Sequence, residues 1–144
     1  MGKYNETFKL LLVEDNDADV FQMKEALREA GIESQLDVLD SGANVMQYLR
    51  KEGAYADTAL PNLIILDLNL PGKGGLQVLK EIKSDAELRQ TPVIILTNSR
   101  NDRDIKDCYA AHANCFLNKP LNFSDFTEIV RNMGRFWLDS AILP

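Results

Sequence analysis

The sequence predicts a doubly wound α/β domain with a five-stranded parallel sheet and five helices. Short apolar runs alternate along the chain with segments in which apolar residues recur every three or four positions. These are the patterns of strands buried on both faces and of amphipathic helices. Four of the runs also end in a polar or charged residue. Alternation of this kind is typical of a parallel sheet with right-handed crossovers and helices on both faces.

The first half of the chain contains two predicted strand–helix pairs. Apolar residues at 10–13 predict the first strand, and the polar residues 16–19 suit the start of a helix that Gly31 can end. Residues 36–39 predict the second strand, and Ser41 can cap the second helix. The predicted inward residues are Val20, Met23, Leu27 and Ala30 in the first helix, and Val45, Tyr48 and Leu49 in the second.

The second half of the chain repeats this order with three further pairs. Strands are predicted at 63–66, 93–96 and 115–117. A loop rich in Gly and Pro at 68–75 precedes the third helix, and a polar loop at 98–103 precedes the fourth. The predicted inward residues of the last three helices are Val78, Leu79 and Ile82; Ile105, Cys108, Tyr109 and His112; and Phe126, Ile129, Val130, Met133 and Trp137.

The composition limits the class of protein and its partners. The chain has 144 residues, of which 45% are apolar and 26% charged, and its net charge is −6. These values are ordinary for one soluble domain, and the negative charge disfavours nucleic acid or an anionic membrane as the main partner. We therefore expect one domain over 1–144, with a core at about 7–138, a tail at 139–144 and no output domain.

The same sequence features predict a cytoplasmic protein. No apolar stretch is long enough for a membrane span, and the polar N-terminus does not resemble a signal peptide. Cys108 and Cys115 are too few for a disulfide framework, so both are expected to be reduced core residues. His112 is the only histidine, and we expect it to be structural and partly buried.

Polar residues at the strand ends predict a functional site at one edge of the sheet. Parallel strands place their carboxyl ends along the same edge, where open α/β sheets bind ligands. This topology brings together Glu14, Asp15, Asp67, Thr97 and Lys119. Three carboxylates without a counterion would repel each other, and a hard divalent cation removes that conflict.

The residue types at this edge suit a cation together with a phosphoryl group. Mg²⁺ prefers carboxylates, water and phosphate oxygens. Asp15 and Asp67 are therefore predicted direct ligands, Glu14 a ligand through water, and the backbone carbonyl of Asn69 a further one. Carboxylates can carry phosphoryl groups, and Asp67 lies between the acidic pair and a lysine, so it is the predicted nucleophile.

Thr97 and Lys119 complete the predicted phosphoryl site. The threonine hydroxyl can donate to a phosphoryl oxygen, and lysine supplies a point charge for such an oxygen or for free Asp67. Taken alone, each side chain is equally compatible with an ordinary strand end or loop. Together, each falls at the end of a separate apolar run, which favours the functional interpretation.

Separated motifs in this order resemble the receiver domains of two-component response regulators. The motifs are Glu14-Asp15-Asn16, Leu66-Asp67-Leu68-Asn69-Leu70-Pro71-Gly72, Thr97 and Asn118-Lys119-Pro120. The resemblance implies the flavodoxin-like receiver fold with strand order 2-1-3-4-5, and Mg²⁺ or Mn²⁺ as cofactor. It implies that Asp67 accepts a phosphoryl group from a sensor histidine kinase, with Thr97 and Phe116 as switch residues. The protein would catalyse only its own phosphorylation and dephosphorylation, so it is not expected to be an enzyme in the usual sense.

Other segments resemble the stand-alone regulators that work with bacterial phytochrome kinases. These are Asn16–Val20, the long polar connection Lys51–Pro61, and the ends Phe136–Leu138 and Ile142–Pro144. That subfamily is associated with homodimers, and the apolar residues near the C-terminus predict one through the fourth helix, the fifth strand, the fifth helix and the tail. One departure is Asn98, which stands where receivers usually have a small residue and is expected to screen the site partly.

Other functions fit the sequence less well. A phosphatase of the haloacid-dehalogenase type places a general acid two residues after its nucleophile, where this chain has Asn69. A flavodoxin needs a Ser/Thr/Gly-rich phosphate loop after the first strand, where this chain has two acids. A degenerate receiver that only binds partners does not require this set of site residues. A phosphorelay shuttle that passes its phosphoryl group to another histidine remains compatible with the sequence.

Overall fold

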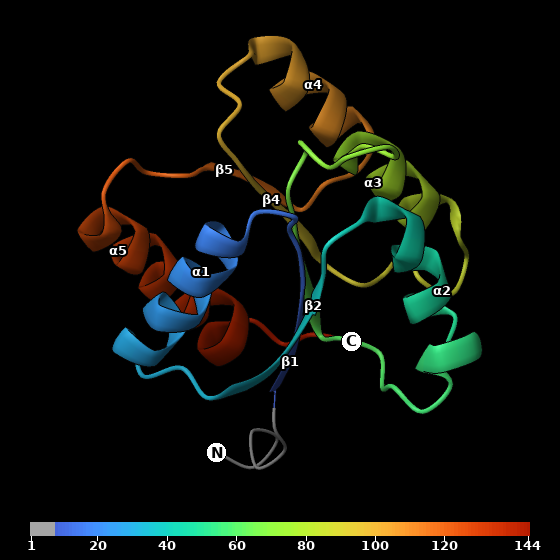
Figure 1. Ribbon diagram of the computed structural model, residues 1–144, viewed down its shortest axis with the longest axis horizontal. Helices are drawn as coiled ribbons and strands as arrows, with labels where there is room; N and C mark the ends of the chain where they lie inside the picture. Colours follow the sequence, from blue (N-terminus) through green and yellow to red (C-terminus); the bar gives the residue numbers. More distant parts are fainter. Residues whose placement is uncertain (1–7) are drawn as a thin grey trace.

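The computed structural model describes residues 8–144 and contains one five-stranded, all-parallel sheet (Figure 1). Its strand order is β2-β1-β3-β4-β5, which confirms the predicted order. Residues 1–7, with the predicted polar N-terminus and the predicted core boundary at residue 7, lie outside the described residues. The strands are β1 (Phe8–Val13), β2 (Ser34–Leu39), β3 (Leu63–Leu66), β4 (Val93–Thr97) and β5 (Cys115–Asn118).

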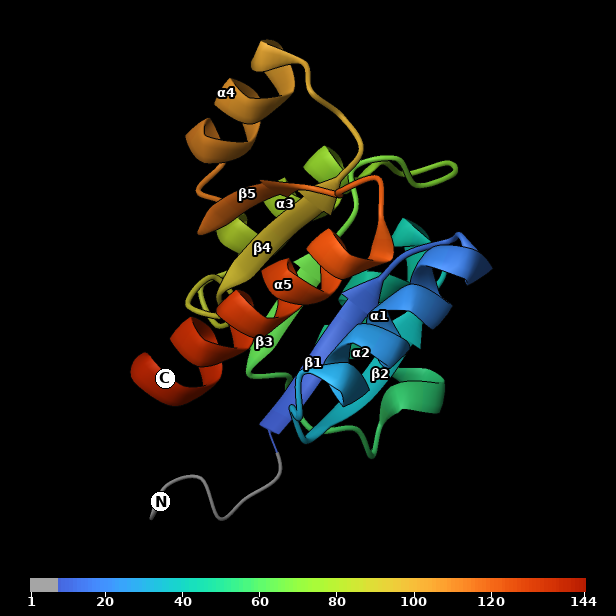
Figure 2. The same ribbon diagram turned by 90° about the vertical axis from the view of Figure 1, so that its left-hand side faces the viewer.

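Helices cover both faces of this sheet. In Figures 1 and 2, α1 and α5 lie together on one face, and α2, α3 and α4 lie on the other. Within residues 8–144, no helix is long and apolar enough to cross a membrane. The helices are α1 (Asp17–Glu29), α2 (Val45–Leu49), α3 (Gly75–Ser84), α4 (Asp102–Ala110) and α5 (Phe123–Gly134), with 3₁₀ turns at Gly42–Asn44 and Gly53–Tyr55 and a π-helical segment, η4, at Arg135–Ser140.

The central strands are apolar along their whole length because both of their faces are covered. Leu10 and Leu12 of β1 pack in the core under α1 and α5, whereas Leu11 and Val13 pack under α2, α3 and α4. Each of these side chains is at most 4% exposed. Burying a side chain of this size contributes roughly 1.5–3 kcal/mol, so the strand ends are held firmly in place.

The ends of α1 follow the sequence prediction. The side chain of Asn16 caps the start by accepting a 3.1 Å hydrogen bond from the amide of Asp19. At the other end Gly31 takes a positive φ of 71°, which glycine adopts without strain. The amides of Gly31 and Ile32 then bond back to the carbonyls of Arg28 and Leu27, forming a Schellman motif.

The predicted inward face of α4 is only partly correct. Cys108 is fully buried, but Ile105 is half-buried and Tyr109 is 48% exposed. His112 is exposed and lies beyond the helix, at a φ of 73° that places it in the left-handed position of the helix end. The reason is the location of α4 at the edge of the sheet, beside β5 and α3, where only a narrow stripe of the helix is covered. Cys115, also expected in the core, is half-buried because β5 is the edge strand.

The C-terminal apolar residues do not all follow a single helical period. The chain passes from α5 into η4, where the amide of Ala141 bonds to the carbonyl of Phe136 at 2.7 Å. The wider π turn buries Leu138 and leaves Phe136 57% exposed. Ile142 is 83% exposed. The C-terminal segment therefore buries only part of this apolar set.

Candidate functional site

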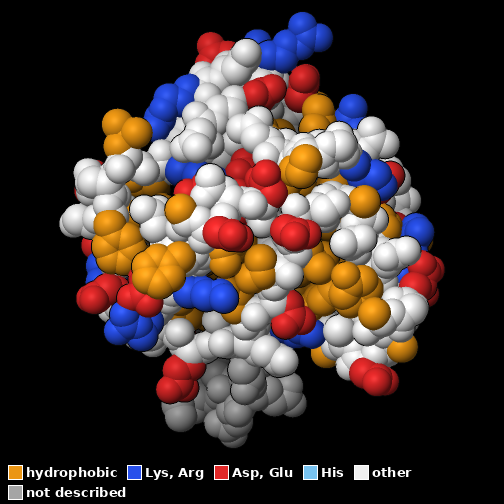
Figure 3. Space-filling view, in the orientation of Figure 1, with side chains coloured by type: hydrophobic (Ala, Val, Ile, Leu, Met, Phe, Trp, Pro, Cys, Tyr) orange, Lys and Arg blue, Asp and Glu red, His pale blue; other side chains and the backbone are white. Residues whose placement is uncertain are grey.

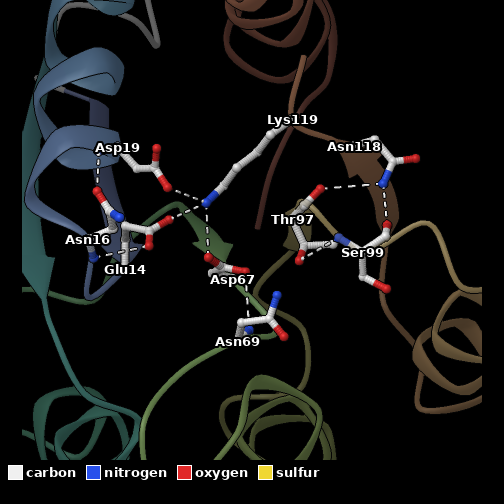
Figure 4. Close-up of polar contacts among 9 residues, drawn as sticks. All are labelled: Glu14, Asn16, Asp19, Asp67, Asn69, Thr97, Ser99, Asn118 and Lys119. Carbon is white, nitrogen blue, oxygen red and sulfur yellow. Dashed lines mark hydrogen bonds and ion pairs between the residues drawn. The ribbon is translucent and has the colours of Figure 1, made fainter. Parts of the chain in front are cut away.

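Four charged side chains converge at the carboxyl edge of the sheet (Figure 4). Glu14 follows β1, Asp67 follows β3, Lys119 follows β5, and Asp19 lies in the first turn of α1. Glu14, Asp67 and Lys119 are only 3%, 5% and 7% exposed. Acidic side chains also gather near the middle of the face shown in Figure 3. Three of the four side chains are thus buried, Asp19 is partly exposed, and the cluster carries an excess of negative charge.

The ammonium group of Lys119 is the centre of this cluster. Its Nζ lies 2.6 Å from Oε1 of Glu14, 2.9 Å from Oδ2 of Asp67 and 2.9 Å from Oδ2 of Asp19. A lysine ammonium has three N–H donors, so these contacts use all of them. Burial alone would lower the pKa of Lys119, but hydrogen bonds to Asp19, Glu14 and Asp67 raise it above its ordinary value. The lysine therefore stays charged.

Asp67 is held in its ionised form although it is buried. Burial acts to raise its pKa, but hydrogen bonds from Lys119, the Asn69 amide and the Thr97 hydroxyl together keep the pKa below its usual value. The amide of Asn69 lies 3.2 Å from Oδ1 of Asp67. An ionised carboxylate with limited solvation is suited to nucleophilic attack.

The backbone around Asp67 is packed closely. Gly75 starts α3 directly against this segment, where a Cβ atom would overlap the carbonyl oxygen of Asp67. Glycine is therefore required there for the close approach of helix and strand end. This packing fixes the carboxylate at the edge of the sheet.

Glu14 differs from Asp67 in its electrostatics. Burial raises the pKa of Glu14 to about 7, against the opposing effect of its hydrogen bond with Lys119. Its second carboxylate oxygen accepts a 3.2 Å hydrogen bond from the amide of Asn16. Three carboxylates thus share one buried ammonium, and an additional cation would relieve their repulsion.

The predicted metal ligands are not all brought together. Asp15 is exposed and forms no hydrogen bond with the other site residues described here. Within residues 8–144, no group of three or more His, Cys, Asp or Glu side chains is arranged to hold a metal ion. Instead, Lys119 bridges Glu14 and Asp67. The oxygen donors of the predicted ligands fit Mg²⁺ or Mn²⁺ in their chemistry.

Thr97 lies on the opposite side of Asp67 from α1 (Figure 4). It is fully buried, and its hydroxyl accepts a 3.3 Å hydrogen bond from the amide of Ser99. The side-chain amide of Asn118 donates to the carbonyls of Thr97 and Ser99, so β5 is tied to the loop that precedes α4. Asn98, the residue expected to screen the site, is exposed.

The predicted switch residue Phe116 is half-buried in β5 and packs against the core under α3 and α4. Its backbone amide donates a 3.1 Å hydrogen bond to the hydroxyl of Tyr109. Because β5 is an edge strand, this amide has no neighbouring strand to bond to. Tyr109 therefore links α4 to the strand that carries Phe116 and leads to Lys119.

Asp19 is a site residue that the sequence analysis did not identify. The sequence predicts it only as one of the polar residues suited to a helix start, yet its carboxylate contacts Lys119. One signal was available in the sequence. Asp19 lies four residues after Asp15, which is about one helical turn from the strand end.

Comparisons with known proteins show which family the chain belongs to. The family model for the response regulator receiver domain matches residues 10–131. Response regulator Rcp1 of Synechocystis sp. is 42% identical over 135 residues, which cover 94% of this chain and 92% of Rcp1.

Two solved structures share the fold along almost their whole length. The crystal structure of the phosphorylated cyanobacterial phytochrome response regulator RcpA has a TM-score of 0.92 and 44% identity, covering 96% of this chain and 99% of RcpA. The Mn²⁺-bound form of Rcp1 has a TM-score of 0.89 and 41% identity, covering 95% and 99% of the two chains. The chain is thus a receiver domain of the two-component response regulator family, a signalling module that resembles the phytochrome-associated regulators.

Proposed function

We propose that Asp67 accepts a phosphoryl group from a sensor histidine kinase and that the modified protein acts by changing its contacts with other proteins. The observation that carries this proposal is the 2.9 Å contact between Lys119 and Asp67. It keeps a buried carboxylate ionised and places a positive charge where phosphoryl oxygens would collect. The expected activity is limited to the protein's own phosphorylation and dephosphorylation.

The chemistry needs little from the protein beyond a nucleophile and charge neutralisation. A carboxylate oxygen of Asp67 forms a bond to the phosphorus of a phosphohistidine while the P–N bond breaks. The electron pair of that bond stays on the histidine nitrogen of the kinase. Hydrolysis later transfers the phosphoryl group to water, which releases inorganic phosphate and restores the Asp67 carboxylate.

We propose Mg²⁺, or Mn²⁺ in its place, as the cofactor. Asp15, Asp67 and the backbone carbonyl of Asn69 would hold it directly, and Glu14 through water. The bound cation supplies positive charge that neutralises the phosphoryl oxygens. Support comes from the oxygen-rich donor set and from the Mn²⁺-bound structure of Rcp1.

Thr97, Lys119 and Phe116 are the proposed readers of the phosphoryl group. Thr97 and Lys119 lie near Asp67 on different strands, so binding of both to one phosphoryl group would draw the two strand ends together. Such a change shifts a population between two states by the difference in their contacts. Phe116, three residues before the lysine, would then turn inward.

The proposed kinase partner is a phytochrome, because relatives over the full length of the chain carry that association in their names. We place the reaction in the cytoplasm, in keeping with the two unpaired cysteines. The proposed assembly is a homodimer through α4, β5, α5 and the C-terminal segment, where Phe136 and Ile142 are exposed. Exposed apolar side chains that gather in one patch usually mark an interface.

Intact-mass measurement tests the phosphorylation. The protein is incubated with a small phosphodonor and Mg²⁺, and we expect one phosphoryl adduct. The adduct should be lost in Asp67→Asn and absent with chelator, whereas Asp57→Asn, in the exposed connection before β3, should behave like the wild type. An adduct that persists in Asp67→Asn would overturn the assignment of the phosphoacceptor.

Sedimentation velocity tests the dimer. Phe136→Ser removes an exposed ring and should shift the protein toward monomer at little cost in stability. Phe21→Ser removes a ring on α1 that is 63% exposed and should leave the assembly unchanged. A wild type that stays monomeric at high concentration, with and without phosphodonor, would overturn the proposed dimer.

A further inference from the structure

Lys119 has no free N–H donor in this structure. Its three contacts are with Glu14, Asp67 and Asp19, at 2.6, 2.9 and 2.9 Å. The three carboxylates are not equivalent, because the side chains of Glu14 and Asp67 are 3% and 7% exposed and that of Asp19 is 29% exposed. Asp19 is also the only one of the three that a helix supplies.

The ammonium group of Lys119 lies on the α1 side of the Asp67 carboxylate. In Figure 4 the lysine side chain reaches toward Glu14 and Asp19, and Thr97 lies on the other side of Asp67. A phosphoryl group that Thr97 and Lys119 bind together must lie between them. Lys119 also contacts Asp19 and Glu14 on the α1 side, so a phosphoryl group shared with Thr97 would compete with these contacts for its N–H donors.

We propose that Asp19 is a positioning residue that holds Lys119 on the α1 side of Asp67 in the unphosphorylated protein, and that phosphorylation releases this contact. The second half of this inference rests on the proposed function. The first half concerns only the resting protein.

Burial explains why Asp19 is the contact that is released. An ammonium that leaves Glu14 would strand a buried carboxylate, which is strongly unfavourable. If the ammonium leaves Asp19, the cost is smaller, because water already reaches that carboxylate. The contact with Asp19 thus favours the position of Lys119 on the α1 side in the resting protein. Lys119 can exchange this contact for one with a doubly charged phosphoryl group.

The first test follows the resting protein without metal or phosphodonor. The ¹⁵N resonance of the Lys119 side chain should move in Asp19→Asn and return toward its wild-type position in Asp19→Glu. Asp17→Asn is the matched control, because Asp17 lies in the same first turn, is exposed and forms no ion pair with Lys119. Both asparagine variants remove one negative charge from the helix start, so they change its interaction with the helix dipole alike.

The second test measures how easily the lysine is released. Beryllofluoride with Mg²⁺ serves as the phosphoryl analogue, and its binding is followed by backbone NMR at Asn69 and Ser99. Asp19→Asn should bind it about five-fold more tightly than the wild type, a factor that corresponds to about 1 kcal/mol. Asp17→Asn should stay within about two-fold, because it changes only the general field.

Different outcomes separate the parts of the inference. An unchanged lysine resonance in Asp19→Asn overturns the positioning role whatever the analogue does. Equal gains in affinity for Asp19→Asn and Asp17→Asn would show a general charge effect and also overturn it. If the wild type does not bind the analogue, the proposed function and the release step both fail, while the lysine resonance still decides the resting contact.

Discussion

The two ends of the sheet each hold a buried lysine, and the two lysines have different surroundings. Lys9, at the amino end of β1, is 6% exposed, and its Nζ lies 2.8 Å from the carbonyl of Ala59 and 3.3 Å from Asp37. The hydroxyl of Tyr48 donates to Asp37 at 2.6 Å, and the ring of Tyr48 lies 5.4 Å from the ammonium. One positive charge meets one negative charge there, and the remaining partners are neutral.

The carboxyl end has the opposite balance. Among residues 8–144, Lys119 is the only cation paired with the three carboxylates of Glu14, Asp19 and Asp67. A balanced pair with neutral partners needs no further ligand and ties β1 to the strand and loop beside it. An excess of buried negative charge is unfavourable by itself and is relieved by a cation or by proton uptake. We therefore expect the amino end of the sheet to stabilise the fold and the carboxyl end to bind ligands.

Substituting each lysine should give the largest difference between the two ends of the sheet. Lys119→Met leaves Glu14 and Asp67 buried without compensation and should cost about 3 kcal/mol in unfolding free energy at pH 8. Lys9→Met leaves Asp37 with its Tyr48 hydrogen bond and some solvent, so we expect a loss of about 1 kcal/mol. Urea denaturation measures both values. Mg²⁺ should restore stability only to Lys119→Met, and equal restoration of both variants would contradict the contrast.

The pH dependence of stability sharpens the same contrast. The pKa of Glu14 is raised by burial from 4.5 to about 7, so the folded state binds this proton more tightly than the unfolded state. Stability should therefore fall as pH rises from about 5 to 7 and level off above, by on the order of 2 kcal/mol. Asp67, whose pKa is lowered, affects stability only at more acidic pH.

Glu14→Gln tests this origin directly. It keeps an oxygen for Lys119 and removes the titrating group, so its stability should be nearly flat from pH 5 to 8. Urea midpoints measured in chelator at several pH values give the comparison. If the wild type shows no decrease in stability from pH 5 to 7, or if Glu14→Gln keeps the decrease, Glu14 is not the group responsible.

Much of this architecture could be predicted from the sequence because short apolar runs determine where strands end. Glu14, Asp67, Thr97 and Lys119 all follow such runs, so their convergence was predicted from topology alone. Asp19 was not predicted, because an acidic residue in the first turn of a helix is common for reasons unrelated to any site.

Two other features lay beyond sequence reasoning for geometric reasons. Tyr109 has the periodicity of an inward residue, but α4 covers only the edge of the sheet, so the ring stays exposed. The π turn of η4 changes which apolar residue faces the core, and a segment of this length is too short for its period to be distinguished from that of an α-helix.

Stabilisation by Mg²⁺ should depend on residues at the carboxyl end of the sheet and not on those at the amino end. At ten times its dissociation constant, a ligand that binds only the folded state adds about 1.4 kcal/mol. We expect Mg²⁺ to raise the urea midpoint of the wild type accordingly, and Asp15→Asn to abolish the effect. Asp37→Asn, at the amino end, should retain it. A full Mg²⁺ effect in Asp15→Asn would mean that the cation binds elsewhere.

Two tyrosine hydroxyls give the smallest and most local comparison. Tyr48 donates to the charged Asp37 at the amino end, and Tyr109 accepts from the amide of Phe116 at the exposed edge of β5. Tyr48→Phe should cost about 1.5 kcal/mol, because a hydrogen bond to a charged group in a part-buried setting is lost. Tyr109→Phe should cost no more than about 0.5 kcal/mol, since water can replace the hydroxyl at an exposed amide.

The Tyr109 variant has a second readout that the Tyr48 variant lacks. The amide resonance of Phe116 should shift, and its hydrogen exchange should accelerate, because its acceptor is gone. If β5 moves when Asp67 is phosphorylated, the loss of this link also makes that movement easier. The Phe116 amide of Tyr109→Phe should then respond to less phosphoryl analogue than in the wild type. An unchanged Phe116 amide in the resting variant would show that the hydroxyl does not hold the edge strand.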